Sequence, residues 1–480
     1  MAPNTSPPST SATRWVVILT AVGSLMAALD TLVVSTALST IRLDFDASVE
    51  QLEWTVNSYN LSFAVLLITG AALGDRYGRR KLYAAGLALF AVASAACALA
   101  PDIGWLIAGR AVQGAGAALI MPLGLALLSA AFPPEKRGAA IGIFSAITGL
   151  AVASGPLVGG AVVEGVSWEW IFWLNVPIGL LAVPLVFSKM RESFGSDASL
   201  DLPGLGLVSG GALGVVWGLV RGNQAGWGSA EVVGALAGGV LLFAAFVAWE
   251  LRAREPMLPM GLFRSRAFSA GNAAIFLTFA SLFTGVFFFA QFLQTALDHG
   301  PLGAGLRLLP WTATFMTVAP LAGAMADRIG ERPLMVTGLT LQAAGLGWFA
   351  LIAEPGMAYS SMLAPFVVAG VGVSLAIPAA QNSVVGAVAP EALGKAAGVN
   401  TMMRELGGVF GIAVTVAVFA GAGSYVSAQT FVDGFGPAIG VAAAMAALGA
   451  IAALLLPARR TVGADIGAEA RPVLEPEGVA

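Results

Sequence analysis

Four ionisable residues lie inside long apolar stretches of this 480-residue sequence: Asp30, Arg110, Arg404 and Glu405. Placing a charged side chain within a membrane costs several kcal/mol, so each is first interpreted as functional. A carboxylate in a dry cavity can bind and release a proton, and a nearby guanidinium changes how readily it does so. We therefore expect Asp30 and Arg110 to couple a proton to function, with Glu405 as a second candidate carrier. The alternative for the first two is a permanent structural ion pair.

Arg404 and Glu405 are neighbours in the sequence. Adjacent helical residues point about 100° apart, which predicts that these two do not pair and that each needs another partner. A structural role for Arg404, with its side chain extending to the membrane surface, is the alternative. Gln113 follows Arg110 by three residues and so shares its helix face, where it would line a substrate cavity or bridge two helices.

Further candidates for a substrate cavity are aromatic and amide side chains within the apolar stretches. Phe279 and Phe283 belong to a stripe with Phe276 and Phe287 at spacings of three and four residues. Such a stripe either stacks on the rings of a bound compound or packs against a neighbouring helix. The amides that could offer adaptable hydrogen bonds are Asn57, Asn60 and Gln381.

Several kinds of chemistry are excluded by residue counts. The chain has one cysteine, Cys97, and one histidine, His299, so it forms no internal disulfide and lacks the Cys/His metal sites. None of its four lysines is followed by Ser or Thr, so it has no phosphate-binding P-loop. We expect no enzyme activity, no metal and no cofactor, and energy supplied by an ion gradient.

The composition indicates a multi-pass membrane protein. Hydrophobic residues make up 58% of the chain and charged residues only 11%, against about 25% charged in soluble domains. The net charge of −3, without a basic patch, argues against nucleic acid as a partner. Fourteen windows are long and apolar enough to span a bilayer. They cover residues 15–38, 51–73, 81–99, 105–131, 138–161, 169–188, 203–221, 230–250, 268–292, 304–325, 333–353, 359–387, 397–420 and 436–457.

The distribution of basic residues predicts the orientation. With the N-terminus in the cytoplasm, 19 of the 24 lysines and arginines fall on the cytoplasmic side. Only Arg42, Arg221 and Arg307 lie outside, while Arg110 and Arg404 lie within spans. An even number of spans returns the C-terminus to the cytoplasm. Scarce lysine and abundant alanine suggest a bacterial cell membrane.

The sequence repeats itself at long range. The loop Gly-Asp-Arg-Tyr-Gly-Arg-Arg around Asp75 recurs in part around Asp327, 252 residues later. A Pro-Glu pair at Glu135 recurs at Glu391, 256 residues later. The repeat is therefore eight helices long, and fourteen helices divide into six, two inserted and six. Same-orientation halves of this kind are a transporter device, with the site between them near the midplane.

The predicted fold is thus all-α and integral to the membrane, with fourteen transmembrane helices in two pseudo-symmetric six-helix bundles plus two inserted helices. The predicted divisions are a cytoplasmic tail (1–14), the N-terminal bundle (15–190), the inserted pair (201–250), the C-terminal bundle (265–457) and a second cytoplasmic tail (458–480).

Several segments together resemble the major facilitator superfamily over essentially the whole chain. The loop Gly74–Arg80, the run Arg110–Gly116 and the run Gly155–Gly160 are similar to three of its motifs, the last to its antiporter motif. Together with Leu29-Asp30, the run Trp170–Gly179 and fourteen spans, they resemble the drug:proton antiporter branch, which implies multidrug efflux and antibiotic resistance.

The resemblance also implies gating residues. Asp75, with Arg76, Gly78 and Arg79, would latch the outward-facing state, although the arginines are also explained by positive-inside charge alone. Gly155-Pro156 would bend its helix and Gly159-Gly160 would let another helix approach closely, which suits a gate or a simple packing notch. The gating candidates are therefore Asp75, Arg76, Gly78, Arg79, Gly155, Pro156, Gly159 and Gly160.

The function that these observations predict is efflux of amphipathic drugs or antibiotics across the cell membrane, driven by protons and working by alternating access. Its partners would be a small organic substrate, protons and the lipid bilayer, and the chain would act as a monomer. Two alternatives stay open: a proton-coupled symporter of a small metabolite, and a membrane sensor without transport activity.

Overall fold

The structure is a computed structural model that describes residues 10–132, 147, 150–151, 154–195, 200–388 and 393–457. Throughout these residues the regular secondary structure is helical, without strands. The two copies of the repeat at Glu135 and Glu391 lie outside the described residues. The all-α prediction is confirmed.

Most helices are long enough to cross a membrane, and three are short segments at breaks in the chain. The helices are α1 (Thr10–Phe45), α2 (Val49–Tyr77), α3 (Arg79–Ala98), α4 (Ile103–Ala131), α6 (Trp170–Trp173), α7 (Asn175–Lys189), α8 (Leu202–Ala225), α9 (Ala230–Glu250), η1 (Met260–Arg264), α10 (Arg266–Thr295), α11 (Pro301–Arg307), α12 (Leu309–Ile329), α13 (Glu331–Ile352), α14 (Tyr359–Val385), α15 (Leu393–Ala422) and α16 (Ala428–Leu454).

Local sequence signals explain where several helices begin. Ser48 and Gln51 form a capping box at the start of α2, and Asp102 accepts the backbone N–H of Trp105 at the start of α4. Gly78 separates α2 from α3 at φ 111°, a conformation in which a residue with a Cβ is strained. These caps set tight turns that hold successive helices antiparallel.

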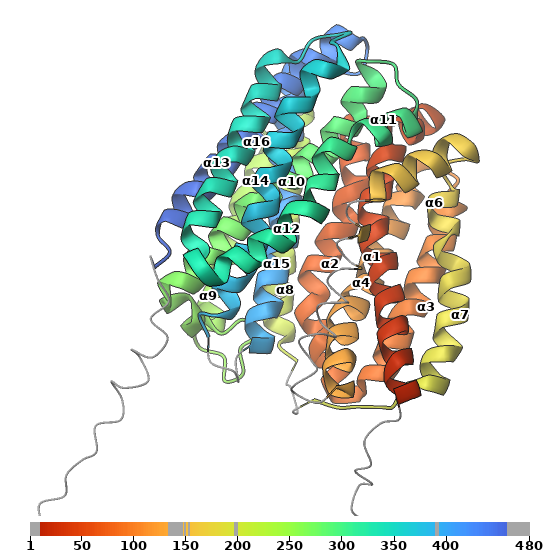
Figure 1. The fold of residues 1–480 in the computed structure, drawn as a ribbon, viewed down its shortest axis with the longest axis vertical. Coiled ribbons are helices and arrows are strands. Elements are labelled where there is room, and N and C mark those ends of the chain that lie inside the picture. Colours follow the sequence, from red (N-terminus) through yellow and green to blue (C-terminus); the bar gives the residue numbers. More distant parts are fainter. Residues whose placement is uncertain are drawn as a thin grey trace, which may run out of the picture.

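The helices gather into two groups (Figure 1). In the first, α4 packs against α1, α2 and α3, and α7 packs against α3. In the second, α10 packs against α14, α15 and α16, and α13 packs against α14 and α16. The groups meet where α1 contacts α10 and α11 and where α2 contacts α15. We call the end where α1 ends and α2 begins the outer end, and the opposite one the inner end.

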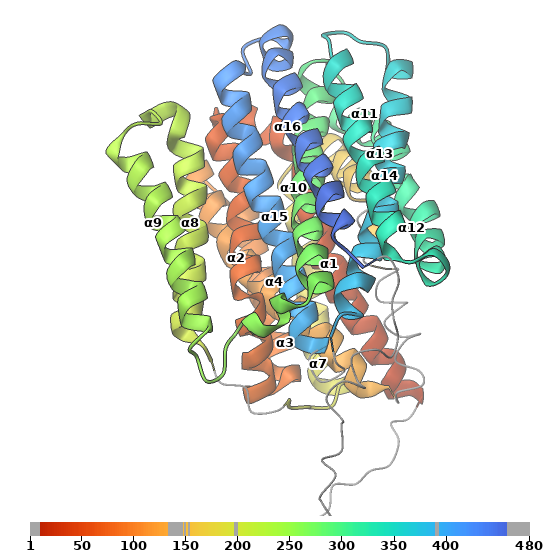
Figure 2. The ribbon, with the colours of Figure 1, turned by 90° about the vertical axis from the view of Figure 1, so that its left-hand side faces the viewer.

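The pair α8 and α9 stands on one flank of the molecule (Figure 2). Helix α8 contacts both α2 and α15, one from each group, and Trp54 of α2 lies 6.1 Å from Trp217 of α8 between ring centroids. Helix α9 is covered mainly by α8. The pair that the sequence predicts to be inserted therefore lies beside the seam between the two groups.

Twelve helices among the described residues are long and apolar enough to cross a membrane. Two of the fourteen expected spans are not among them. The span expected at 138–161 lies partly outside the described residues, and the span expected at 304–325 is divided at Leu308 between α11 and α12. The multi-pass architecture is confirmed, while the count of fourteen stays a prediction.

Candidate functional site

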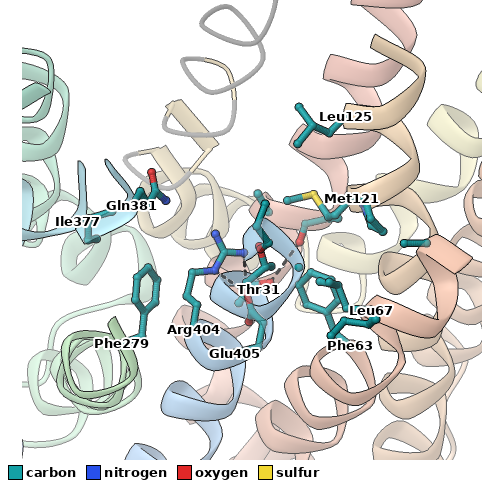
Figure 3. Close-up of a pocket in the computed structure, with 18 of the residues that line it drawn as sticks. Thr31, Phe63, Leu67, Met121, Leu125, Phe279, Ile377, Gln381, Arg404 and Glu405 are labelled. Carbon is teal, nitrogen blue, oxygen red and sulfur yellow. Dashed lines mark hydrogen bonds and ion pairs between the residues drawn. The ribbon is translucent and has the colours of Figure 1, made fainter. Parts of the chain in front are cut away.

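A cavity of about 1460 Å³ lies between the two groups of helices. The first group contributes Thr31, Phe63 and Met121, and the second group contributes Phe279 and Gln381 (Figure 3). Apolar residues make up most of the remaining wall, which also carries the charged residues Asp75, Arg79, Asp201, Glu255, Lys395, Arg404 and Glu405. This is the composition expected of a site for small organic molecules.

The cavity reaches the inner end of the bundle. Asp75 and Arg79, at the junction of α2 and α3, belong to its lining, as does Lys395 at the start of α15. The outer end is closed by contacts between the groups described below. The structure is thus a conformation with access from the inner end.

The cavity wall carries one ion pair at mid-depth. Arg404 Nη2 lies 2.6 Å from Glu405 Oε1, and the Arg404 guanidinium stands 5.5 Å from the ring centroid of Phe279. The side chain of Arg404 is 22% exposed and that of Glu405 only 4%. The expectation that these neighbours do not pair is wrong, because the long arginine side chain folds back and compensates for the angle between them.

A second ion pair is buried within the first group of helices. Asp30 and Arg110 contact each other directly, and both side chains are 1% exposed. Gln113 donates to Asp30 at 2.7 Å and accepts from Arg110 at 2.6 Å, and Asn175 donates to Asp30 at 3.2 Å. The carboxylate thus has a cation and two amides around it, which satisfies the requirements of a buried charge.

Arg110 is held by more than the carboxylate. Its Nε donates to the backbone oxygen of Thr55 at 3.1 Å, and its guanidinium lies 4.3 Å from the ring centroid of Tyr59. Asp30 itself does not line the cavity, but its neighbour Thr31 does. One helix residue therefore connects the buried pair to the substrate space in this conformation.

Several predicted cavity residues lie elsewhere. Gln113, Asn57 and Asn60 are completely buried and do not line the cavity in this conformation. Gln113 of α4 bridges two helices, which is the alternative role predicted for it, because its amide also donates to Ser94 of α3 at 2.8 Å. Phe279, Phe283 and Gln381 do line the cavity.

The phenylalanine stripe of α10 serves both predicted roles: two of its rings face the cavity and two pack against other side chains. Phe279 and Phe283 face the cavity, and their ring centroids are 5.8 Å apart. Phe276 packs against Phe410 instead, and Phe287 against Phe288. A stripe spans a wide arc of a helix, so its ends contact different neighbours.

The predicted glycine gate lies at the closed outer contact. A methyl group on Gly160 would overlap the carbonyl oxygen of Pro301, and one on Gly305 would overlap that of Pro156. Gly159 lies equally close to Thr36 of α1. The helical segment 154–165 is thus packed between α1 and α11, and backbone contact there requires glycine. Glu164 also accepts the backbone N–H of Leu302 at 2.9 Å, across the same contact.

The junction of α2 and α3 holds the other gating candidates: Asp75 and Arg76 lie in the last turn of α2, Gly78 lies between the helices, and Arg79 begins α3. Asp75 Oδ1 lies 2.7 Å from Arg79 Nε, and its backbone oxygen accepts the N–H of Gly195. The guanidinium of Arg76 lies 5.4 Å from the ring of Tyr77, and Gly78 occupies the positive-φ turn. These contacts all stay within the first group of helices.

Sequence reasoning did not single out several residues of the site. Trp311 and Phe315 of α12, with Thr31 and Phe63, line the cavity. Aromatic and hydroxyl residues are common in membrane helices, so only the packing of two groups identifies which of them face the centre. Ser94 and Asn175 complete the Asp30 network, and their signal was a polar side chain within an apolar span.

Two groups of membrane-length helices around a central cavity that opens at one end are the architecture of a membrane transporter. The family model described as Major Facilitator Superfamily matches residues 20–411 and 271–476. The chain belongs to this family.

The relatives support the drug-efflux branch of the family. A "Tetracenomycin C resistance and export protein" of Streptomyces glaucescens is 38% identical and covers 82% of this chain and 73% of its own. A "Multidrug resistance protein Stp" of Mycobacterium tuberculosis is 36% identical, with 84% and 75% covered. The puromycin resistance protein of Streptomyces alboniger is 33% identical, with 94% and 93% covered.

Solved structures share the fold. A POT family transporter in complex with thioalcohol conjugated peptide matches with a TM-score of 0.69 at 14% identity, covering 92% of this chain and 95% of that one. The xylose transporter XylE from E. coli, in a partially occluded inward open conformation, matches with a TM-score of 0.60 at 16% identity and covers 92% and 97%.

Proposed function

We propose that the protein exports amphipathic organic compounds from a bacterial cell in exchange for protons. The observation that carries the proposal is the placement of an apolar, aromatic cavity open at the inner end directly beside a buried, fully hydrogen-bonded Asp30–Arg110 pair. A compound enters the cavity from the inner end, and the proton-binding group Asp30 is the neighbour of Thr31 in the cavity wall.

The orientation follows from the charges around the cavity mouth. Arg79, Arg80, Lys81 and Lys395 lie at the inner end, whereas Arg42 lies at the outer end. Because cytoplasmic loops carry the excess of basic residues, the inner end faces the cytoplasm and the cavity accepts compounds from inside the cell. The same rule puts both termini in the cytoplasm.

The exchange works through competition for Asp30. In the inward-open state Arg110, Gln113 and Asn175 stabilise the ionised carboxylate. When the molecule opens outward, movement of α1 against α4 separates Asp30 from Arg110, and the carboxylate binds a proton from the outside. Return to the inward-open state restores the Arg110 contact and releases that proton into the cell. Asp75 and the glycine contact around Pro156 change partners during these movements.

The substrate class follows from the cavity wall. Phe279, Phe283, Trp311 and Phe315 offer flat apolar faces, and Gln381 offers an amide. Ring stacking contributes about 0.5–1.5 kcal/mol for each aromatic pair. Compounds with aromatic rings and a few polar groups fit this wall, so tetracenomycin C and puromycin, which the names of two relatives contain, are the first compounds to test.

The test measures uptake of tetracenomycin C and puromycin into everted membrane vesicles with an acidic interior. We expect accumulation that collapses when the proton gradient is dissipated and that is lost in Asp30→Asn. Asp433→Asn is the matched control, since it removes an exposed carboxylate from a transmembrane helix away from the network. Accumulation of neither compound in the parent would contradict export of this class, and accumulation that survives in Asp30→Asn would contradict the role of Asp30. Accumulation only with the opposite gradient would instead indicate a symporter.

A further inference from the structure

A second buried carboxyl group lies in α2, outside the network of Asp30. The side chain of Glu53 is completely buried, and its Oε1 accepts the amide N–H of Asn57 at 3.1 Å. Its other oxygen, Oε2, has no hydrogen-bond partner in the described structure, and neither does Oδ1 of Asn57. Both side-chain polar atoms of Asn60 are also without a partner.

The unpartnered oxygens of Glu53 and Asn57 share a chemical explanation, which does not extend to Asn60. Nearly all buried polar atoms in proteins are hydrogen-bonded, so two acceptors without a donor on side chains that already pair with each other indicate a missing donor. If Glu53 carries a proton on Oε2, it becomes a donor, and the facing acceptor that lacks a partner is Oδ1 of Asn57. One proton then completes a paired acid–amide arrangement. Reversing the Asn57 amide does not achieve this, because it leaves the same number of acceptors without a donor.

The position of Glu53 connects it to the seam between the two groups of helices. Spacings of four and three residues put Glu53, Asn57 and Asn60 on one face of α2. On the next turns of that face, Leu61 and Ala64 pack in one apolar cluster with residues of α15. Those α15 residues are Ala396, Val399, Met402, Leu406, Val409 and Ala413. The row of polar residues Glu53, Asn57 and Asn60 therefore lies on the face of α2 that contacts α15, nearer the outer end.

Most charged groups of the surrounding helices have partners other than Glu53, although Nε of Arg42 is itself without a hydrogen-bond partner. On α2 itself, Glu50 adds a further negative charge. Among the helices that pack against α2, three carry ion pairs: Arg110 with Asp30, Arg221 of α8 with Glu231, and Arg404 with Glu405 of α15. Arg42 of α1 lies over the ring of Tyr425, and Asp102 caps α4. The basic residues of α3 and Lys395 lie at the inner end. No described cation forms an ion pair with Glu53, and burying an unpaired carboxylate is costly.

We propose that protonation of Glu53 controls whether α2 and α15 come together at the outer end, a contact that we call the outer seam. The two helices close there only when Glu53 carries a proton from the outer solution. Opening of the seam exposes the carboxyl group to water, which returns the proton to the same side. The proton combines with the carboxylate to give the neutral acid and is not carried across the membrane. This proposal rests on the alternating-access export proposed above, but it uses a different residue and a different proton.

The test follows the outer seam directly. Spin labels are placed at Leu43 and Val426, which are 72% and 89% exposed at the outer ends of the two groups, in a Cys97→Ala background. Asp30→Asn is present throughout, so that Asp30 makes no contribution to the pH response. The label separation is measured in lipid nanodiscs between about pH 5 and about pH 9.

We expect the separation to shift from a short, closed population to a long, open one as the pH rises, by up to about tenfold in population ratio per pH unit for one linked proton. In Glu53→Gln the closed population should persist at every pH, because the amide supplies the missing N–H to Asn57. Glu50→Gln removes a partly exposed carboxylate one turn away and should keep a pH response, displaced to lower pH because a negative charge that favours the protonated form of Glu53 is lost.

An unchanged pH response in Glu53→Gln, or no pH response in the parent, would overturn the proposal. Glu53→Asp is the control for a folding defect at this position. It keeps a titratable carboxyl group, so the label separation must still respond to pH in this variant. In everted vesicles with Asp30 intact, Glu53→Gln should slow puromycin uptake, because its outer seam opens rarely, while the number of protons released per puromycin taken up stays unchanged. A loss of that exchange ratio would assign Glu53 to transport and overturn its role as a control on closure, whereas failure of the export proposal shows in Asp30→Asn.

Discussion

At the scale of single residues, substitution of Asp30 and substitution of Arg110 should have different effects on the stability of the protein. Arg110→Ala removes at once the hydrogen bonds to Asp30, Gln113 and the backbone oxygen of Thr55 and leaves a gap, whereas Asp30→Asn keeps a side chain of the same size whose amide oxygen can still accept from its former partners. Each change leaves one buried charge without its partner, a loss of about 3–5 kcal/mol, and Arg110→Ala adds the cost of the other lost contacts and of the gap. The two substitutions should therefore differ in stability although both affect the same contact.

We predict that Arg110→Ala lowers the melting temperature in detergent far more than Asp30→Asn does. Arg221→Ala serves as the control, because its pair with Glu231 is 37% and 43% exposed and such pairs contribute about 0–1 kcal/mol. The double variant Asp30→Asn/Arg110→Ala should recover part of the loss. Equal destabilisation by the two single variants would contradict the additional stabilisation that we assign to the contacts of Arg110 with Thr55, Gln113 and Tyr59.

A second prediction concerns the aromatic wall. Phe279→Ala should weaken binding of puromycin about tenfold, a change of about 1.4 kcal/mol, because it removes a ring from the cavity and from beneath Arg404. Equilibrium binding to the purified protein measures this change. Phe276→Ala removes the same side chain one turn earlier on α10, where it packs on Phe410 outside the cavity, and should leave affinity unchanged. Equal losses in both variants would show that α10 acts only through packing.

At the scale of elements, the contact between segment 154–165 and α11 holds the outer end closed. Gly305→Ala should therefore prevent full closure, because the added methyl group overlaps the carbonyl oxygen of Pro156. The expected readout is a longer separation between labels at Leu43 and Val426, with loss of drug accumulation. Gly303→Ala lies on the same short helix with its nearest neighbour, Arg307, at 3.4 Å, and should have neither effect. If the label separation in Gly305→Ala equals that of the parent, the contact between segment 154–165 and α11 does not act as a gate.

The sequence predicts elements better than it predicts contacts between them. Apolar windows located the long helices because a bilayer imposes their length and composition. The break at Leu308 escaped this reasoning, since Pro310 starts a new helix without interrupting the apolar run. The paired Arg404 and Glu405 were missed because helix geometry fixes the directions of Cβ atoms and not the reach of long side chains. The meeting of Asp30 with Arg110 was predictable from their similar depth, but Glu53 was overlooked at the margin of an apolar window.

At the scale of the whole molecule, the arrangement of α8 and α9 tests the number of membrane crossings. In a Cys97→Ala background, a cysteine at Gly228 should react with a membrane-impermeant maleimide from outside intact cells, and one at Arg254 only in everted vesicles. Both positions are exposed, at the two ends of α9. Lys81→Cys and Val426→Cys mark the inner and outer sides as controls. Labelling of both test positions from one side would mean that α9 does not cross the membrane.

The buried ion pairs have an electrical consequence. Asp30 with Arg110, and Arg404 with Glu405, each sum to zero within the bundle. Reorientation of the inward-open pairs therefore moves little fixed charge through the membrane field, and voltage acts mainly on what the protein carries. One elementary charge moved through 100 mV corresponds to about 2.3 kcal/mol. Exchange of a neutral compound for one proton would then draw on both voltage and pH, whereas exchange of a monovalent cation for one proton would be electrically silent and draw on pH alone.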